Sequence, residues 1–127
     1  MNVTIELVTL VAKEIFVDFS TDVGSAVAVW HGAPPKVGDH YDVELEIGDE
    51  FFWGVNACPA LNNVDSIKVR DDIVTMTGTL ISNATNGCGV VDLRGSKILV
   101  ELAGCAEVGP LFIDLKVKSL SLYPTGV

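Results

Sequence analysis

The chain has 127 residues, of which 49% are hydrophobic, and a formal net charge of −9. This length suits one domain, residues 1–127, with an apolar core. A face that neutralises nucleic-acid phosphates has to be positive, so the charge excludes nucleic acid as the expected partner. The mean hydropathy is +0.43, yet no apolar run approaches the roughly 20 residues of a membrane-spanning helix, and we expect no membrane contact.

The first residues, "MNVTIELVTLVAKE", contain no basic leader, and Glu6 interrupts the apolar run. A secretory signal needs a basic leader and an uninterrupted apolar run, so the cytoplasm is the expected compartment. The three cysteines, Cys58, Cys88 and Cys105, form no CxxC pair. We therefore expect reduced thiols that act as small core residues.

The acidic residues are concentrated in the first half of the chain. Through residue 56 there are ten acids and two bases, whereas the remainder carries seven acids and six bases. Such an asymmetry produces a directional field that steers a cationic partner. The alternative interpretation is that the acids serve only solubility.

Alternating apolar and polar residues predict strands along the first thirty residues. Val3, Ile5, Leu7 and Val11 share one parity and are predicted to face the core together. A second strand is expected over 14–20. The following stretch, "SAVAVW", is apolar at both parities, which predicts a central strand or one covered on both faces. The segment "HGAPPKVGD" then breaks the chain because proline cannot donate ladder hydrogen bonds.

The strand predicted over 40–47 alternates apolar residues with Asp42, Glu44 and Glu46. A "GDE" turn leads from it into "FFWGVN", which predicts a β-hairpin. The stretch "VGDHYDVELEI" resembles the Gly-Asp turn and alternating strand of OB-like barrels. This resemblance covers one strand only and implies no particular function.

Three further strand features follow. "IKVR" and "DIVTMTGTLI" are predicted to pair through a turn near Asp71–Asp72, with a bulge or bend at Gly78. "CGVVDL" and "KILVEL" predict a second hairpin. The last strand, 111–123, changes its apolar parity, which predicts a bulge near Lys118–Ser119.

No segment has a sustained helical period, so the expected fold is all-β with about eight to ten strands. Glycines inside strands favour a small antiparallel barrel, closed or partly open and OB-like. A two-sheet β-sandwich is the alternative.

The acidic strand and the aromatic residues after it predict a non-enzymatic protein-binding module for a basic protein, such as an immunity-type inhibitor. A ring left outside the core would anchor the interface, and the carboxylates would form its rim. The predicted partner-binding residues are Asp42, Glu44, Glu46, Asp49, Glu50 and Phe52.

Two alternatives remain open at this point. A small-ligand or metal-binding barrel, which includes an enzyme, would use His31, His40, Cys58 and Cys88. Their spacing matches no metal-ligand motif, and no cofactor is predicted. A structural homo-oligomer or a homodimer would instead close off exposed edge strands with a second copy.

Overall fold

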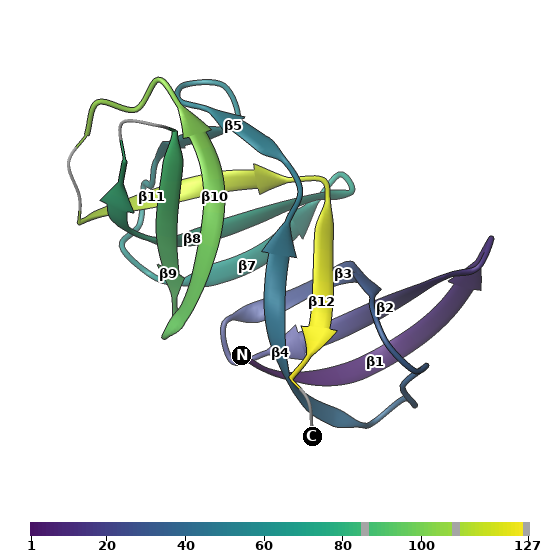
Figure 1. The fold of residues 1–127 in the computed structure, drawn as a ribbon. Helices are drawn as coiled ribbons and strands as arrows, with labels where there is room; N and C mark the ends of the chain where they lie inside the picture. Colours follow the sequence, from purple (N-terminus) through teal and green to yellow (C-terminus); the bar gives the residue numbers. More distant parts are fainter. Residues whose placement is uncertain (85–86, 108–109, 126–127) are drawn as a thin grey trace.

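The computed structural model describes residues 1–84, 87–107 and 110–125 (Figure 1). These residues form twelve strands: β1 (Asn2–Val11), β2 (Glu14–Thr21), β3 (Gly24–Trp30), β4 (His40–Ile47), β5 (Glu50–Phe52), β6 (Ala57–Pro59), β7 (Ser66–Arg70), β8 (Ile73–Asn83), β9 (Cys88–Leu93), β10 (Ser96–Ala103), β11 (Leu111–Val117) and β12 (Leu120–Pro124). The all-β prediction is confirmed, with more strands than expected. Among the described residues, no helix is long and apolar enough to cross a membrane.

Five strands close into a small barrel, which we call the ring. β1 pairs with β2 and β4, β2 pairs with β3, and β12 pairs with β4, all antiparallel. A short parallel contact between β3 and β12 closes the circle. In Figure 1 these strands form the lower right part of the molecule. The predicted barrel is therefore confirmed, although one of its pairings is parallel.

The ring is filled by alternate residues of its strands, as the period-two pattern predicts. Val17 and Phe19 of β2 and Leu122 of β12 have no exposed surface. The parity prediction for β1 is wrong beyond Ile5, because the register shifts between Ile5 and Leu7. This irregularity turns the later apolar residues outward, and Leu7 is 51% exposed.

The remaining strands form a second group around β8. One edge of β8 pairs with β11. The other edge pairs with β7 in the first half of β8 and with β9 in its second half. All three pairings are antiparallel. β10 extends this group from β9, and β5 joins β10 in parallel. β6 pairs with β11. In Figure 1 this group lies at the upper left.

The ring and the second group meet where β3 touches β7. A single parallel bridge joins Gly24 to Ile67, and the Ile67 amide donates to the Val23 carbonyl over 2.9 Å. A side chain at Gly24 would place its Cβ 1.9 Å from the Ile67 carbonyl oxygen. Only glycine permits this approach, so Gly24 fixes how closely the two strands meet.

The chain crosses between the ring and the second group at two adjacent points, β4 to β5 and β11 to β12. The Gly48 amide donates to the Ser119 carbonyl over 2.9 Å. The Asp49 carboxylate accepts hydrogen bonds from the backbone amides of Lys118 and Ser119, at 3.0 and 2.8 Å for the shorter contacts. These bonds tie the two crossings together.

The crossings explain two differences from the sequence predictions. The hairpin expected between 40–47 and "FFWGVN" is wrong, because β4 pairs with β1 and β12 while β5 pairs with β10. The parity change near Lys118–Ser119 is present, but there the chain leaves β11 and enters the ring as β12. A change of sheet partner, rather than a bulge, reverses the buried face.

The structure also tests the two other predicted hairpins and the bulge or bend predicted at Gly78. The β7–β8 and β9–β10 hairpins are confirmed, and both turns use residues with positive φ, Asp71 with Asp72 and Arg94 with Gly95. In β8 the register shifts between Leu80 and Ser82 rather than at the glycine. Gly78 instead leaves room for the Asp92 carbonyl oxygen, which a Cβ would meet at 2.7 Å.

Candidate interaction surface

The acidic side chains of β4 point away from the ring. Asp42, Glu44 and Glu46 are exposed, whereas Val43 and Ile47 between and beside them are buried. β4 therefore holds a row of three carboxylates on its outer side because the ring core takes the alternate residues. Neighbours in this row lie about 7 Å apart along the strand, close enough for mutual repulsion.

Asp42 is already engaged within the protein. Its carboxylate lies 3.0 Å from the amino group of Met1 and accepts a hydrogen bond from the Thr125 hydroxyl over 2.9 Å. The hydrogen bond from the Met1 amino group, followed by the one from Thr125, lowers the pKa of Asp42. This acid helps to hold the two ends of the described chain against β4.

Of the predicted partner-binding residues beyond β4, one is also engaged within the protein and two are exposed. Asp49 is half-buried and holds the crossing described above. Glu50 and Phe52 are exposed on β5, with Phe52 at 49%, while Phe51 between them is 1% exposed. β5 thus presents one carboxylate and one aromatic ring outside the core.

β12 lies beside β4 and adds groups that the sequence analysis did not identify. Ser121 is aligned with Glu46, and Tyr123 is aligned with Glu44. Burial raises the pKa of Tyr123, and the charge of Glu46 together with a hydrogen bond to it raises the pKa further. The phenol therefore stays neutral and can donate to the carboxylate.

His31 follows β3 and completes this part of the surface. Its ring stacks on Tyr123 with centroids 4.3 Å apart and planes 7° from parallel. Its Nε2 lies 3.1 Å from the Ser121 hydroxyl. We call Glu44, Glu46, Ser121, Tyr123 and His31 the acidic face. A carboxylate pair beside a flat aromatic stack suits an arginine or lysine side chain, which can pair with the acids and lie over the rings.

The four residues of the metal or ligand alternative are distributed over the molecule. His31 belongs to the acidic face, whereas the His40 Nδ1 lies 2.9 Å from the Thr4 hydroxyl. Cys58 lies in β6 and Cys88 in β9. Within residues 1–84, 87–107 and 110–125, no three His, Cys, Asp or Glu side chains come together as a metal site.

The prediction of core cysteines is wrong for Cys58 and Cys88. Cys58 and Cys88 are exposed, and Cys105 is half-buried. Cys105 packs against the edge of the buried cluster, whereas Cys58 and Cys88 do not belong to that cluster.

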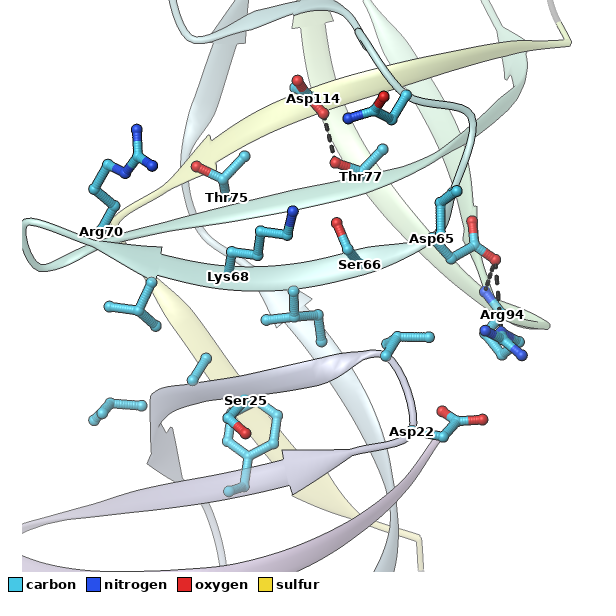
Figure 2. Close-up of a pocket in the computed structure, with 18 of the residues that line it drawn as sticks. Asp22, Ser25, Asp65, Ser66, Lys68, Arg70, Thr75, Thr77, Arg94 and Asp114 are labelled. Atoms are coloured by element: carbon cyan, nitrogen blue, oxygen red, sulfur yellow. Dashed lines mark hydrogen bonds and ion pairs between the residues drawn. The ribbon is translucent and has the colours of Figure 1, made fainter.

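A groove of about 1440 Å³ opens where β3 and β7 diverge from their single bridge (Figure 2). Its apolar part includes Val27 and Val69, which are 46% and 50% exposed. Its polar part includes Lys68, Arg70 and the Thr77 hydroxyl, which donates to Asp114. The prediction of a central strand is confirmed, since β3 pairs with β2 on one edge and with β12 and β7 on the other. Cover on both faces is wrong, because Val27 opens onto this groove.

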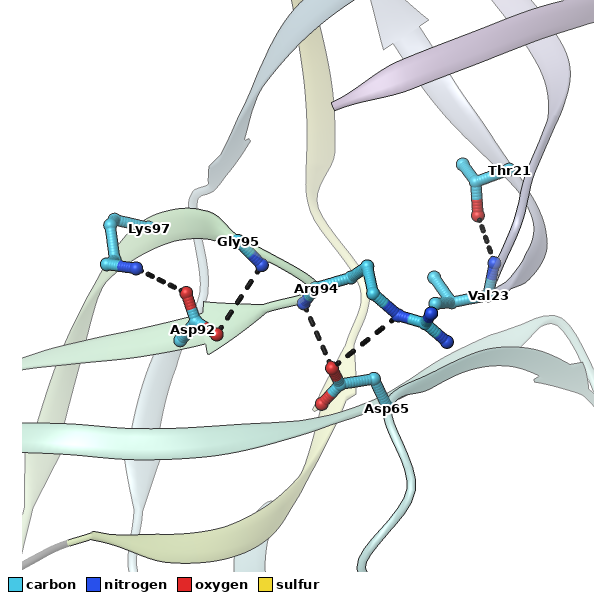
Figure 3. A network of polar contacts seen from close by, with 7 residues as sticks. All are labelled: Thr21, Val23, Asp65, Asp92, Arg94, Gly95 and Lys97. Atoms are coloured by element: carbon cyan, nitrogen blue, oxygen red, sulfur yellow. Dashed lines mark hydrogen bonds and ion pairs between the residues drawn. The ribbon is translucent and has the colours of Figure 1, made fainter.

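One end of the groove is held by a small polar network (Figure 3). The Arg94 amide donates to the Asp65 carboxylate over 3.1 Å, and the Arg94 Nε lies 3.9 Å from the same oxygen. Lys97 pairs with Asp92, whose pKa is lowered mainly by that hydrogen bond. These contacts order the β9–β10 turn and pair the charges of Arg94 and Lys97 with nearby carboxylates.

Searches with the chain found no matching family model, no matching curated protein and no matching solved structure.

Proposed function

We propose that the protein is a non-enzymatic binding module whose acidic face receives a basic segment of a partner protein. The observation that carries the proposal is the position of Glu44 and Glu46. Within the described chain neither forms an ion pair with a cation, and both stand beside the Tyr123–His31 stack. The proposed interface also includes three exposed residues of the same chain segment, Asp42 on β4 and Glu50 and Phe52 on β5.

Electrostatics and aromatic packing would act at different stages of binding. The net charge of −9 attracts a cationic partner over long distances and speeds encounter. Burial of Tyr123 and Phe52 would then slow dissociation, because desolvated aromatic contacts dominate interface energies. Asp49, by contrast, serves the fold and is left out of the proposed interface.

The biological role that we favour is inhibition of a basic protein, in the manner of an immunity-type protein that neutralises a cationic toxin. A rigid β scaffold with a preformed charged face suits this role because it loses little conformational entropy on binding.

The test is affinity capture from the native cell at low salt, followed by elution with rising salt. The wild type is compared with E44Q/E46Q, which removes two charges from the acidic face. The matched control is D71N/D72N in the β7–β8 turn. It removes the same charge, and asparagine accepts the positive φ of both positions.

We expect the wild type and D71N/D72N to retain the same cationic protein, and E44Q/E46Q to lose it. Equal capture by all three proteins would contradict the proposed site, since the interaction would then not depend on Glu44 and Glu46. Equal loss in both variants would show that only the total charge matters.

A further inference from the structure

The outer edge of β1 is open over its second half. β1 pairs with β4 only from Asn2 to Thr4, and the Ile5 backbone groups bond to Gly38 and Asp39. From Leu7 to Val11 the only ladder partner within the described chain is β2. Every second residue of this segment therefore directs its backbone amide and carbonyl into solvent.

The same segment exposes apolar side chains. Leu7 is 51%, Leu10 72% and Val11 52% exposed. The segment contains no proline and no charged residue, although such residues are the usual protection of a free edge. An apolar and unprotected edge of five residues is suited to pairing with another strand.

The edge is also complementary to itself. In an antiparallel pair centred on Thr9, Leu7 of one copy faces Val11 of the other. The same register places Val8 opposite Leu10, and each of these pairings occurs twice about the two-fold axis. Apolar side chains of the two copies therefore lie opposite each other along the edge, with Thr9 at its centre.

We infer that two copies of the chain associate through β1, with Leu7–Val11 pairing antiparallel across a two-fold axis. The occupant of the edge is a second copy, because the length and the apolar pattern match in this register. The inference does not depend on the proposed function, since β1 lies outside the acidic face. The dimer would carry two acidic faces.

The test measures the mass of the purified protein by light scattering over a range of concentrations. The variant L10K introduces a charge on the edge, and L99K is the matched control. Leu99 is 75% exposed on β10, nearly the same as Leu10 at 72%. Both substitutions add one positive charge at an exposed leucine, and only L10K lies on β1, the strand of the proposed contact.

We expect the wild type and L99K to form dimers that dissociate on dilution, and L10K to raise the dimer dissociation constant about tenfold or more. Higher salt should preserve or strengthen the dimer, because two copies of charge −9 repel each other. Capture through the acidic face should instead weaken with salt. A monomeric wild type at every concentration, or an L10K dimer as tight as the wild type, would overturn the inference.

A crosslink tests the register directly. Thr9 lies opposite Thr9 of the second copy in the proposed pairing, within the Cα separation that a disulfide spans. Mild oxidation should convert T9C into a covalent dimer that reducing agent reverses. The wild type and L99C, which carry the same native cysteines, should stay largely uncrosslinked. A dimeric T9C that forms no more crosslink than L99C would rule out this edge.

Discussion

The ring and the second group share one strand architecture but use charge differently. Residues 1–47 and 120–125, which include the ring, carry eight acids and two bases. Residues 48–119 carry nine acids and six bases. Both side-chain ion pairs of the described chain, Arg94 with Asp65 and Lys97 with Asp92, lie in the second group.

This difference separates two uses of a carboxylate. In the second group two acids, Asp65 and Asp92, pair with cations and order the β9–β10 connection. In the ring Glu44 and Glu46 stand in a row without a cation from the described chain. Uncompensated charge on a rigid face adds little to stability, and we therefore assign it to the proposed attraction of a partner.

The largest expected effect lies at the contact between the two regions. G24A should destabilise the protein by about 3 kcal/mol, because a methyl group there meets the Ile67 carbonyl and the residue has positive φ. G95A is the control, since Gly95 also has positive φ but open space around it, and should cost about 1 kcal/mol. Urea unfolding measures both. Equal losses would mean that strain, and not the close approach, decides the cost.

The paired crossings give the next largest effect. D49A removes the acceptor of the Lys118 and Ser119 amides and should cost about 2 kcal/mol. E50A, the neighbouring exposed acid, should leave the thermal midpoint nearly unchanged. A loss as large for E50A as for D49A would contradict the separation of structural from surface acids.

Neutralising acids in the two regions should change stability in opposite directions. D92N should cost about 0.5 kcal/mol, because it weakens the pair with Lys97. E44Q/E46Q should gain about 0.3 kcal/mol by relieving repulsion. Both are measured by urea unfolding at neutral pH, and a loss in E44Q/E46Q would show that these carboxylates stabilise the ring.

The pH dependence of D92N follows from the lowered pKa of Asp92 in the folded protein. A lowered folded pKa contributes stability above the unfolded pKa, and this stability disappears as the pH falls through the folded value. The difference between the wild type and D92N should therefore vanish in acid. A difference that persists there would assign the effect to packing.

The smallest expected effect concerns Tyr123. E46Q should lower its pKa, because the Glu46 charge and hydrogen bond contribute to the raised value after burial. Phenolate absorbance in a Y41F background measures this change, since Tyr41 also has a raised pKa. An unchanged titration would mean that burial alone raises the pKa of Tyr123.

The sequence predicts the strands and the outward row on β4 because both depend on local alternation. The parity change near Lys118–Ser119 marks the right place, but it predicts a bulge there, whereas the structure has the crossing from β11 to β12. The pairing of β5 with β10 and the exposure of Leu7 depend on contacts and irregularities that no local pattern encodes. The acidic face illustrates the same limit, since His31 and Tyr123 are 92 residues apart in sequence and stack only after the ring closes.

The groove between β3 and β7 was missed for a related reason. Val27 and Val69 have the composition of core residues, and only the divergence of two strands after one bridge exposes them. A pattern of apolar residues predicts that a strand is buried. It does not show whether the fold places another element against the strand to bury it.

The most direct test of the central claim is an NMR titration of the ¹⁵N-labelled protein with a short arginine-rich peptide. We predict that amide shifts concentrate on β4, β12 and His31, and that E44Q/E46Q abolishes them while D71N/D72N does not. Shifts that favour the Asp71–Asp72 turn, or that spread evenly over all exposed acids, would contradict a dedicated cation-binding face on the ring.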